Sequence, residues 1–235
     1  MPLDGKTPNM LWVGAREVPL AVRVHPRARH IALVVDGASR GVRLTLPPGV
    51  SVKAGLRFAS KHADWLESQL SSLPPRVSFA PGARIPLLGR PHVIHHSPER
   101  RGGVWREADR VFVSGRPEHL ARRLGDFLKR EARETIAPKA HDLAARIDRR
   151  PARITVREMK SRWGSCSSDG RLRFNWRLVL APEAILDYVV AHEVAHLVHM
   201  DHSRRFWRVV DRLCPDAAAA RRWLAKNGND LMRYG

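Results

Sequence analysis

Apolar and polar residues alternate with a period of two along residues 18–46 of the chain. The polar sequences HPRARH and DGASRG interrupt this alternation. Such a pattern predicts antiparallel strands joined by turns. Short apolar pieces broken by Gly and Pro return between residues 79 and 113, and they predict a second group of strands. Between the two groups, Ser51 can cap a helix that should end before Pro74.

The apolar positions follow helical spacing from Pro117 onward. Leu120, Leu124 and Leu128 belong to a helix that is kinked or broken near Pro138. ARITVRE and RLRFNW are then short strands on either side of the polar loop MKSRWGSCSSDG. The sequence shows no internal repeat.

A further helix opens with Pro182 at its favoured first position and extends to about Met200. Two more helices complete the chain, and Gly228 ends the last of them. The pattern as a whole predicts an α+β fold. A β-rich region with one helix covers residues 1–115, and a second domain with the C-terminal helices covers residues 116–235.

The composition is that of a folded, globular protein. Of the 235 residues 43% are hydrophobic, and no apolar run approaches the roughly 18 residues that a membrane span needs. The first residues lack the basic and apolar regions of a signal peptide, so we expect a soluble, cytoplasmic protein with no membrane partner. Cys166 and Cys214 are expected to be reduced, with a disulfide as the minor alternative.

The chain carries a large excess of positive charge. Lys and Arg number 42 against 23 Asp and Glu, a formal net charge of +19. Such an excess attracts polyanions, so nucleic acid is a possible partner. The arginines are spread over the whole chain, however, and solvated basic faces explain them at least as well.

Four histidines and one glutamate interrupt the apolar helix near residue 192. His192 and His196 lie one helical turn apart, so their imidazoles point the same way and can bind one ion. Glu193, rotated by about 100° from His192, lies beside such an ion and can take a proton from a metal-bound water. The string HEVAH is the H-E-x-x-H pattern of zinc proteases.

A catalytic zinc needs three protein ligands and one open position, so a third ligand must lie nearby. The turn sequence HMDH offers two histidines. We prefer His202, because it begins a new segment that can fold back over the ion, whereas His199 continues the same helix. The alternative is that all four histidines are ordinary polar groups.

The sequence from Arg157 to Asp216 resembles the YgjP-like metallopeptidase domain, a family of predicted metal-dependent hydrolases related to SprT-like and other gluzincin-type zinc proteases. The matching features are the RWGSC loop, the NWRL strand end, DYVVAHE, and H-E-x-x-H followed after five residues by HSRRFW. ADWL and ARIPLLGRPH in the N-terminal part agree as well. The resemblance implies a zincin-like domain over residues 116–235 and assigns Zn²⁺ to three histidines and the catalytic base to a glutamate: His192, His196, His202 and Glu193.

This resemblance implies hydrolysis of a peptide or protein substrate by zinc-activated water. Zincins commonly bind substrate along an exposed edge strand, and RLRFNW is the expected edge. Asn175 or Arg177 is predicted to contact the substrate backbone, with a structural role at the strand end as an equal alternative. No second donor to the oxyanion is identifiable in the sequence.

Several neighbouring residues have predicted structural roles. Trp163 and Trp207 are expected to pack around the metal segments. Asp187 or Asp201 is a candidate to hydrogen-bond a liganding imidazole. Cys166 as a fourth zinc ligand is a minor alternative, because a hydrolase needs an open coordination site.

The alternative function is that of a nucleic-acid-associated protein, with a structural metal or with a protease that acts on DNA-bound proteins. A structural metal site has no use for Glu193, so an enzyme is favoured. The N-terminal sheet also lacks aromatic residues at regular strand spacing on which bases could stack. The sequence defines no specificity pocket and no oligomeric state.

Overall fold

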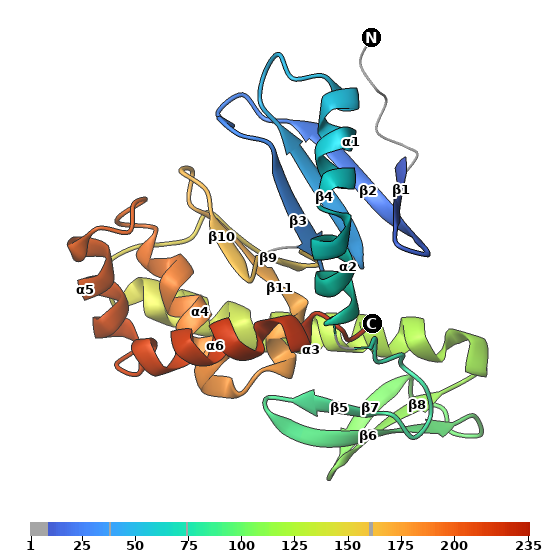
Figure 1. Cartoon of the computed structure of the whole chain (residues 1–235). Helices are drawn as coiled ribbons and strands as arrows, with labels where there is room; N and C mark the ends of the chain where they lie inside the picture. Colours follow the sequence, from blue (N-terminus) through green and yellow to red (C-terminus); the bar gives the residue numbers. More distant parts are fainter. Residues whose placement is uncertain (1–8, 38, 74, 160–161) are drawn as a thin grey trace. The chain divides into compact units, whose positions relative to one another are not determined.

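The computed structural model describes residues 9–37, 39–73, 75–159 and 162–235. It divides into two compact units, Met1–Pro75 and Arg76–Gly235, here called the N-terminal and C-terminal units. Each unit has a hydrophobic core of its own. The whole is an α+β protein, as predicted (Figure 1).

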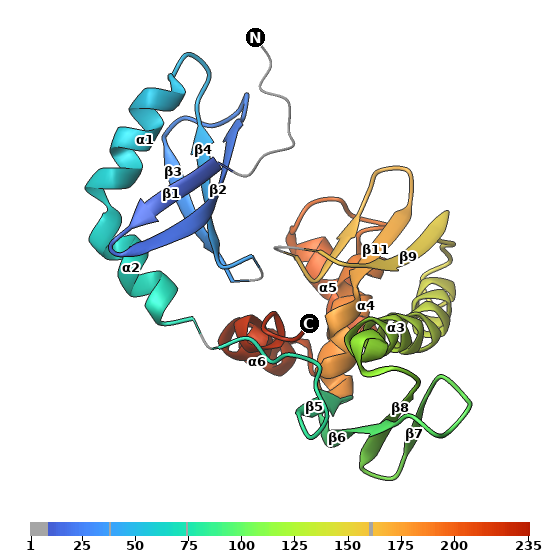
Figure 2. The same ribbon diagram turned by 90° about the vertical axis from the view of Figure 1, so that its right-hand side faces the viewer.

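The N-terminal unit is one sheet with two helices. Its elements are β1 (Asn9–Val13), β2 (Arg16–Val24), β3 (Ala32–Asp36), β4 (Gly41–Leu46), α1 (Val52–Lys61) and α2 (Ala63–Ser71). Figure 2 shows the two helices along one face of the sheet. Alternate strand residues point to that face, and the core forms there from Val18, Leu20, Leu44, Leu46, Leu66 and Leu70.

Two predictions for this unit were wrong in detail. The strand order is β1-β2-β4-β3, so β2 and β4 are parallel neighbours while the two hairpins are antiparallel. The predicted single helix is two helices, because His62 leaves the helical conformation (φ −108°, ψ 22°) between α1 and α2.

The C-terminal unit begins with a sheet of the same connectivity. It contains β5 (Arg84–Leu87), β6 (Arg90–Ser97), β7 (Val104–Glu107) and β8 (Arg110–Ser114), in the order β5-β6-β8-β7. Again the two central strands are parallel and both outer pairs antiparallel. The two sheets are thus a structural repeat that the sequence does not reveal.

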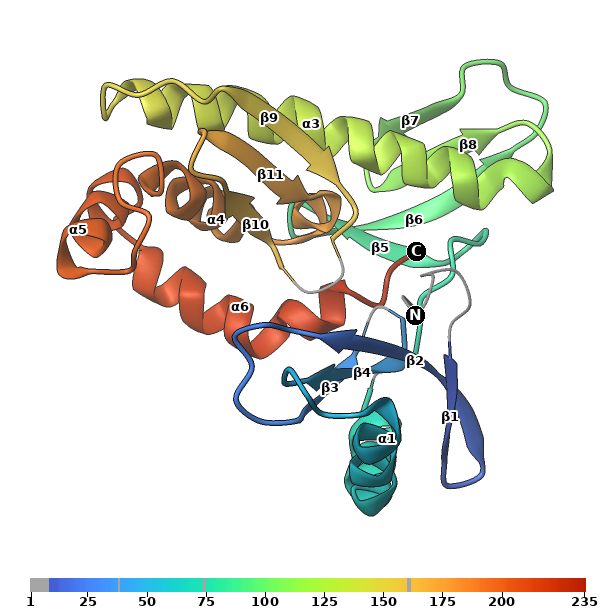
Figure 3. The same ribbon diagram turned by 90° about the horizontal axis from the view of Figure 1, so that it is seen from above.

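A long helix follows that sheet after a short 3-10 turn, Pro117–His119. This helix, α3 (Leu120–Ala145), continues unbroken through Pro138. Figure 3 shows it passing both sheets of the C-terminal unit, and its contacts with β7, β8 and β9 agree. Leu120, Leu124 and Leu128 are buried in the core that also holds the apolar residues of β5–β8.

Because these strands and α3 share one core, the boundary between the two units differs from the predicted domain boundary. The predicted boundary follows residue 115, whereas the two compact units of the structure meet after Pro75. Strands β5–β8 bury Ile85, Ile94 and Val111 in one core with Leu124 of α3, so they belong to the C-terminal unit. None of the helices in the described part of the chain is long and apolar enough to cross a membrane.

The remaining elements surround the H-E-x-x-H segment. They are β9 (Arg153–Arg157), β10 (Gly164–Cys166), β11 (Arg171–Asn175), a 3-10 segment (Trp176–Leu180), α4 (Glu183–Ala195), α5 (Arg204–Leu213) and α6 (Ala217–Leu231). The sheet order is β10-β11-β9. The strand RLRFNW was therefore wrongly predicted to be an edge: β11 is central, and β10 and β9 are the edges.

Two helix ends also differ from the prediction. Helix α4 ends at Ala195 and not near Met200, because His196 forms its C-cap and the chain turns after it. Helix α6 continues past Gly228 to Leu231. Gly228 is useful there because a Cβ at this position would lie 3.2 Å from the indole Nε1 of Trp163, closer than ordinary packing.

Candidate metal centre

Helix α4 carries the candidate site in its last turn. The helix is apolar nearly all round, because it packs against α3, α5, α6 and β10. Leu186, Val190 and Val194 are fully buried. The chemistry-bearing residues are therefore held on a helix whose position is determined by the core.

Three histidines converge beyond the end of α4. The ligand atoms of His192, His196 and His202 all lie within 4.8 Å of one another. The Nε2 atoms of His192 and His202 are 3.2 Å apart. The Nδ1 atom of His196 lies 2.9 Å from the carbonyl oxygen of His199, so this nitrogen donates to the carbonyl and Nε2 is left as the ligand atom. All three imidazoles thus offer a nitrogen to one point.

His199 and His202 have different positions. His199 contributes its backbone carbonyl to the orientation of His196. His202 is brought back toward His192 by the turn between α4 and α5. That turn ends with the carboxylate of Asp201 accepting from the Ser203 amide and with Ser203 capping α5.

A phenylalanine packs against all three imidazole rings. Phe206, buried on α5, has ring centroids 4.9, 4.5 and 4.8 Å from those of His192, His196 and His202. Trp207 packs beside His192 and His202, as its predicted packing role requires. Phe206 was not among the predicted site residues, although its position four residues after His202, in the first turn of a predicted helix, was an available signal.

Two of the three histidines have surroundings that favour the neutral imidazole, the form that a metal needs. Burial, and to a lesser extent the neighbouring charges of His196 and His202, lower the pKa of His192 to about 4. Burial also lowers the pKa of His196, although its bond to His199 opposes this. Neutral imidazole is the metal-binding form, so the donor set fits a metal ion.

Glu193 is buried between α4 and β10, with 6% of its surface exposed. Burial raises the pKa of its carboxyl group to about 7, and the positive charge of Arg162 opposes the rise. A carboxyl group whose pKa lies near neutrality can both accept and return a proton. Glu193 therefore has the electrostatics of an acid-base residue.

Two open cavities flank Glu193. One, of about 260 Å³, is lined by the three histidines together with Ser165, Cys166 and Met200. The other, of about 250 Å³, is lined by Trp163, Tyr188, Val189 and Leu224. His192, Glu193, Gly164 and Arg162 line both. Arg162, which was not among the predicted site residues, is thus a cation that faces this site.

Asn175 and Arg177 lie inside the protein and line neither of these two cavities. The Asn175 amide donates to the carbonyl oxygen of Met159 at 2.9 Å, and its oxygen accepts from the amide of Arg177. The Arg177 guanidinium donates to the Tyr234 carbonyl and to Glu158, both at 2.9 Å. These contacts favour the structural alternative, and substrate contact stays a prediction.

Cys166 lines the cavity with the histidines but lies outside the group of three convergent ligands. Burial raises the pKa of its thiol to about 11, and the charge of Glu193 contributes. Both Cys166 and Cys214 are free.

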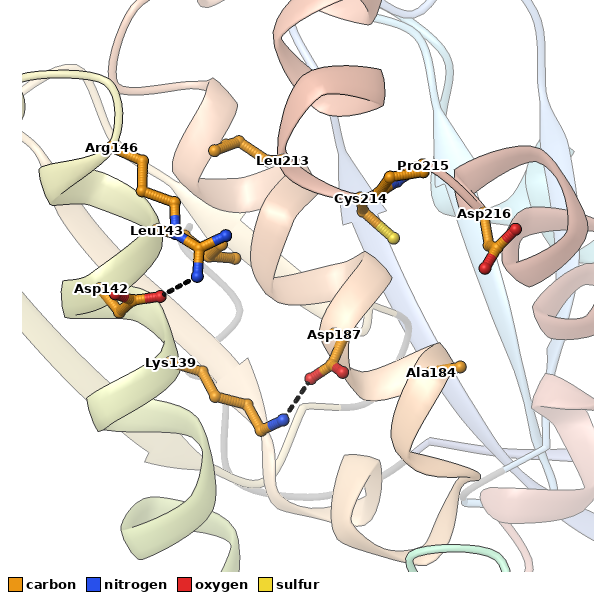
Figure 4. A pocket seen from close by; sticks show the side chains of 10 residues that line it. All are labelled: Lys139, Asp142, Leu143, Arg146, Ala184, Asp187, Leu213, Cys214, Pro215 and Asp216. Atoms are coloured by element: carbon orange, nitrogen blue, oxygen red, sulfur yellow. Dashed lines mark hydrogen bonds and ion pairs between the residues drawn. The ribbon is translucent and has the colours of Figure 1, made fainter.

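Asp187 belongs to a different cavity, behind α4. Figure 4 shows this space of about 330 Å³ between α3, α4 and the α5–α6 connection. The Lys139 ammonium lies 2.7 Å from the Asp187 carboxylate and 2.8 Å from that of Glu183. The ion pair of Asp187 therefore links α4 to α3, and within the described part of the chain Asp187 makes no contact with an imidazole.

One of the similar solved structures is a metallopeptidase. The crystal structure of the metallopeptidase zymogen of Pyrococcus abyssi abylysin has 25% sequence identity and a TM-score of 0.34. The match covers 40% of this chain and 93% of that chain. A search of curated proteins gave no match.

The sequence also matches a family, and the match covers most of both structural units. The YgjP-like metallopeptidase domain matches residues 29–227. This range contains the H-E-x-x-H segment, the RWGSC strand, and strands β3 and β4 of the N-terminal sheet together with α1 and α2. The resemblance read from the motifs is thereby confirmed: the chain belongs to the YgjP-like metallopeptidase family.

Proposed function

We propose that this protein is a zinc-dependent peptidase in which His192, His196 and His202 hold the metal and Glu193 is the general base. The observation that carries the proposal is the convergence of three imidazoles beside a buried carboxyl group. Membership of a metallopeptidase family supports metal-dependent hydrolysis of peptide bonds.

The donor set favours zinc. Three imidazole nitrogens with an open cavity beside them match the ligand set of a catalytic zinc, in which a fourth position stays open. Oxygen-rich sites, which magnesium and calcium prefer, are a different chemistry. Bound zinc would supply Lewis-acid activation of water and of the substrate carbonyl.

The protein's own residues supply the proton transfers. Glu193 accepts a proton from the attacking water at its carboxylate and returns it to the departing amine. Burial raises the pKa of the Glu193 carboxyl group to about 7 and leaves little of its surface exposed to bulk water. Arg162 faces the same space, where its positive charge stabilises negative charge that develops on the substrate carbonyl oxygen.

The structure also changes the expected substrate track. We propose that the peptide pairs with β10, because β10 is an edge of the three-stranded sheet and contacts α4. Gly164 of β10 lies against Glu193. A peptide on this edge would lie beside the base and the histidines, with one cavity on either side of the scissile bond.

Metal analysis combined with a peptide digest tests the proposal directly. Purified protein should contain about one zinc per chain and cleave peptides within a mixture of known sequence. Mass spectrometry of the products shows the cleavage sites. Protein that carries zinc but releases no peptide fragments would contradict peptidase activity, and protein that selects a different metal would contradict zinc.

A second candidate property is binding to nucleic acid. Helix α5, which begins two residues after His202, exposes four arginines and one acid on its outer side: Arg204, Arg205, Arg208, Arg212 and Asp211. Such a row attracts phosphate groups. We propose that this arginine row binds DNA or RNA without sequence preference.

Salt dependence tests the arginine row. With four phosphate contacts, a fourfold rise in salt is expected to weaken binding on the order of 10²-fold. Fluorescence anisotropy with a labelled oligonucleotide measures it. Changing the four α5 arginines to glutamine should abolish this binding. The matched control changes four exposed arginines of the N-terminal unit, and equal losses in both variants would show non-local charge: Arg23, Arg27, Arg29 and Arg57.

A further inference from the structure

We propose that Gly164 is a positioning residue for Glu193: the missing side chain at residue 164 makes the space that holds the Glu193 carboxylate. The inference rests on the proposed function, because it assigns a role in the same reaction. It also assigns a role to the RWGSC sequence, because the glycine of this sequence packs against the proposed general base.

The evidence is a very close approach of β10 to the Glu193 side chain. A Cβ atom placed on Gly164 would lie 2.5 Å from Cγ, 2.6 Å from Oε1 and 2.8 Å from Cδ of Glu193. Carbon atoms in contact prefer about 3.5–4.0 Å, so any side chain here would overlap the glutamate. All three of the nearest atoms belong to Glu193.

Backbone conformation does not require this glycine. Gly164 is absent from the residues with positive φ, so its backbone is open to alanine. The helix and turn glycines of the chain have other surroundings: Gly125 on α3, for example, has no atom within 4 Å of its would-be Cβ. Gly164 therefore matters for the space it leaves.

The glutamate carboxylate is the part that would move. The β10 backbone is held by its pairing with β11, where Gly164 lies opposite Phe174, and by the bond from the Asn175 amide to the Trp163 carbonyl, 2.9 Å. The α4 backbone is held by the buried core. The Glu193 side chain, in contrast, adjoins an open cavity on either side.

Gly164→Ala should therefore displace the base and spare the ligands. We expect kcat to fall on the order of 10²–10⁴-fold, as for loss of a general base, with KM and zinc content unchanged. Gly125→Ala is the matched control and should keep the wild-type kcat. In a Glu193→Gln background, where no base remains, Gly164→Ala should reduce kcat little further.

A crystal structure of Gly164→Ala provides a readout that does not depend on activity. We expect Glu193 in a new rotamer with the three histidines unmoved; Glu193 in its present position would overturn the inference. If Gly164→Ala lowers the melting temperature, adding Glu193→Ala removes the overlapping atoms and should restore it. A pair that stays as unstable as Gly164→Ala alone would also overturn it.

The activity measurements separate the two proposals. A wild-type protein that cleaves no peptide contradicts the proposed function, while the rotamer of Glu193 still decides the role of Gly164. A wild-type protein that cleaves peptides and a Gly164→Ala variant that cleaves them equally fast contradict the inference alone.

Discussion

Glu193→Gln is expected to retain its zinc and to hydrolyse peptides about 10²–10⁴-fold more slowly than the wild type, the usual size of a general-base contribution. Glutamine has nearly the size of glutamate but cannot accept the proton. The loss should fall on kcat, because the change removes a proton acceptor and leaves the neighbouring cavities in place. Elemental analysis and initial rates at saturating peptide measure the two quantities.

Glu183→Gln is the matched control for this experiment. Glu183 lies on the same helix α4, but its carboxylate is 57% exposed and pairs with Lys139, away from the histidines. An exposed ion pair of this kind contributes little to stability. The control should therefore keep both zinc and rate. If Glu193→Gln kept zinc and cleaved at the wild-type rate, another residue would have to be the base.

The two helix histidines and the glutamate could be predicted, because the spacing of residues along a helix determines which way their side chains point. Positions four residues apart face the same side, so His192 and His196 were paired from the sequence, and Glu193 was placed beside them. His192 and Glu193 lie on α4, and His196 lies at its C-terminal end. His202 was proposed from its place after the helix, and the structure brings its Nε2 to 3.2 Å from that of His192.

Features that depend on contacts between distant segments could not be predicted in the same way. Alternation along β11 shows that one face is buried, but it does not show which strands lie on either side, so the edge was misassigned. The domain boundary failed for a related reason. The apolar residues of β5–β8 and those of α3 were both visible in the sequence, but their packing into one core was not.

Gly164 and Phe206 illustrate the same limit within the site. Each lies outside α4, Gly164 on β10 and Phe206 on α5, and acts through a contact with an α4 side chain that the fold creates. A glycine in a Gly/Ser loop is read from sequence as a turn residue. Here it belongs to a strand, and its importance lies in the side chain that faces it.

His202→Ala is expected to lose most of its zinc while His199→Ala keeps it. Removal of an outer partner of a metal ligand costs roughly 10–100-fold in affinity, and removal of a ligand itself should cost more. His202 offers Nε2 to the common point of the three imidazoles. His199 acts through its backbone carbonyl, which accepts from Nδ1 of His196 and which alanine retains. The two substitutions thus remove the same side chain three residues apart, with opposite consequences for the site.

Competition with a chelator of known affinity measures both variants on one scale, with elemental analysis of the dialysed proteins as the check. Both should fold, because neither side chain belongs to the buried core. His202→Ala should also lose peptide hydrolysis with its zinc, whereas His199→Ala should keep it. If zinc were retained by His202→Ala and lost by His199→Ala, the third ligand would be His199, and the turn between α4 and α5 would have to rearrange around the metal. Retention by both variants would mean that the two helix histidines hold zinc without a third imidazole.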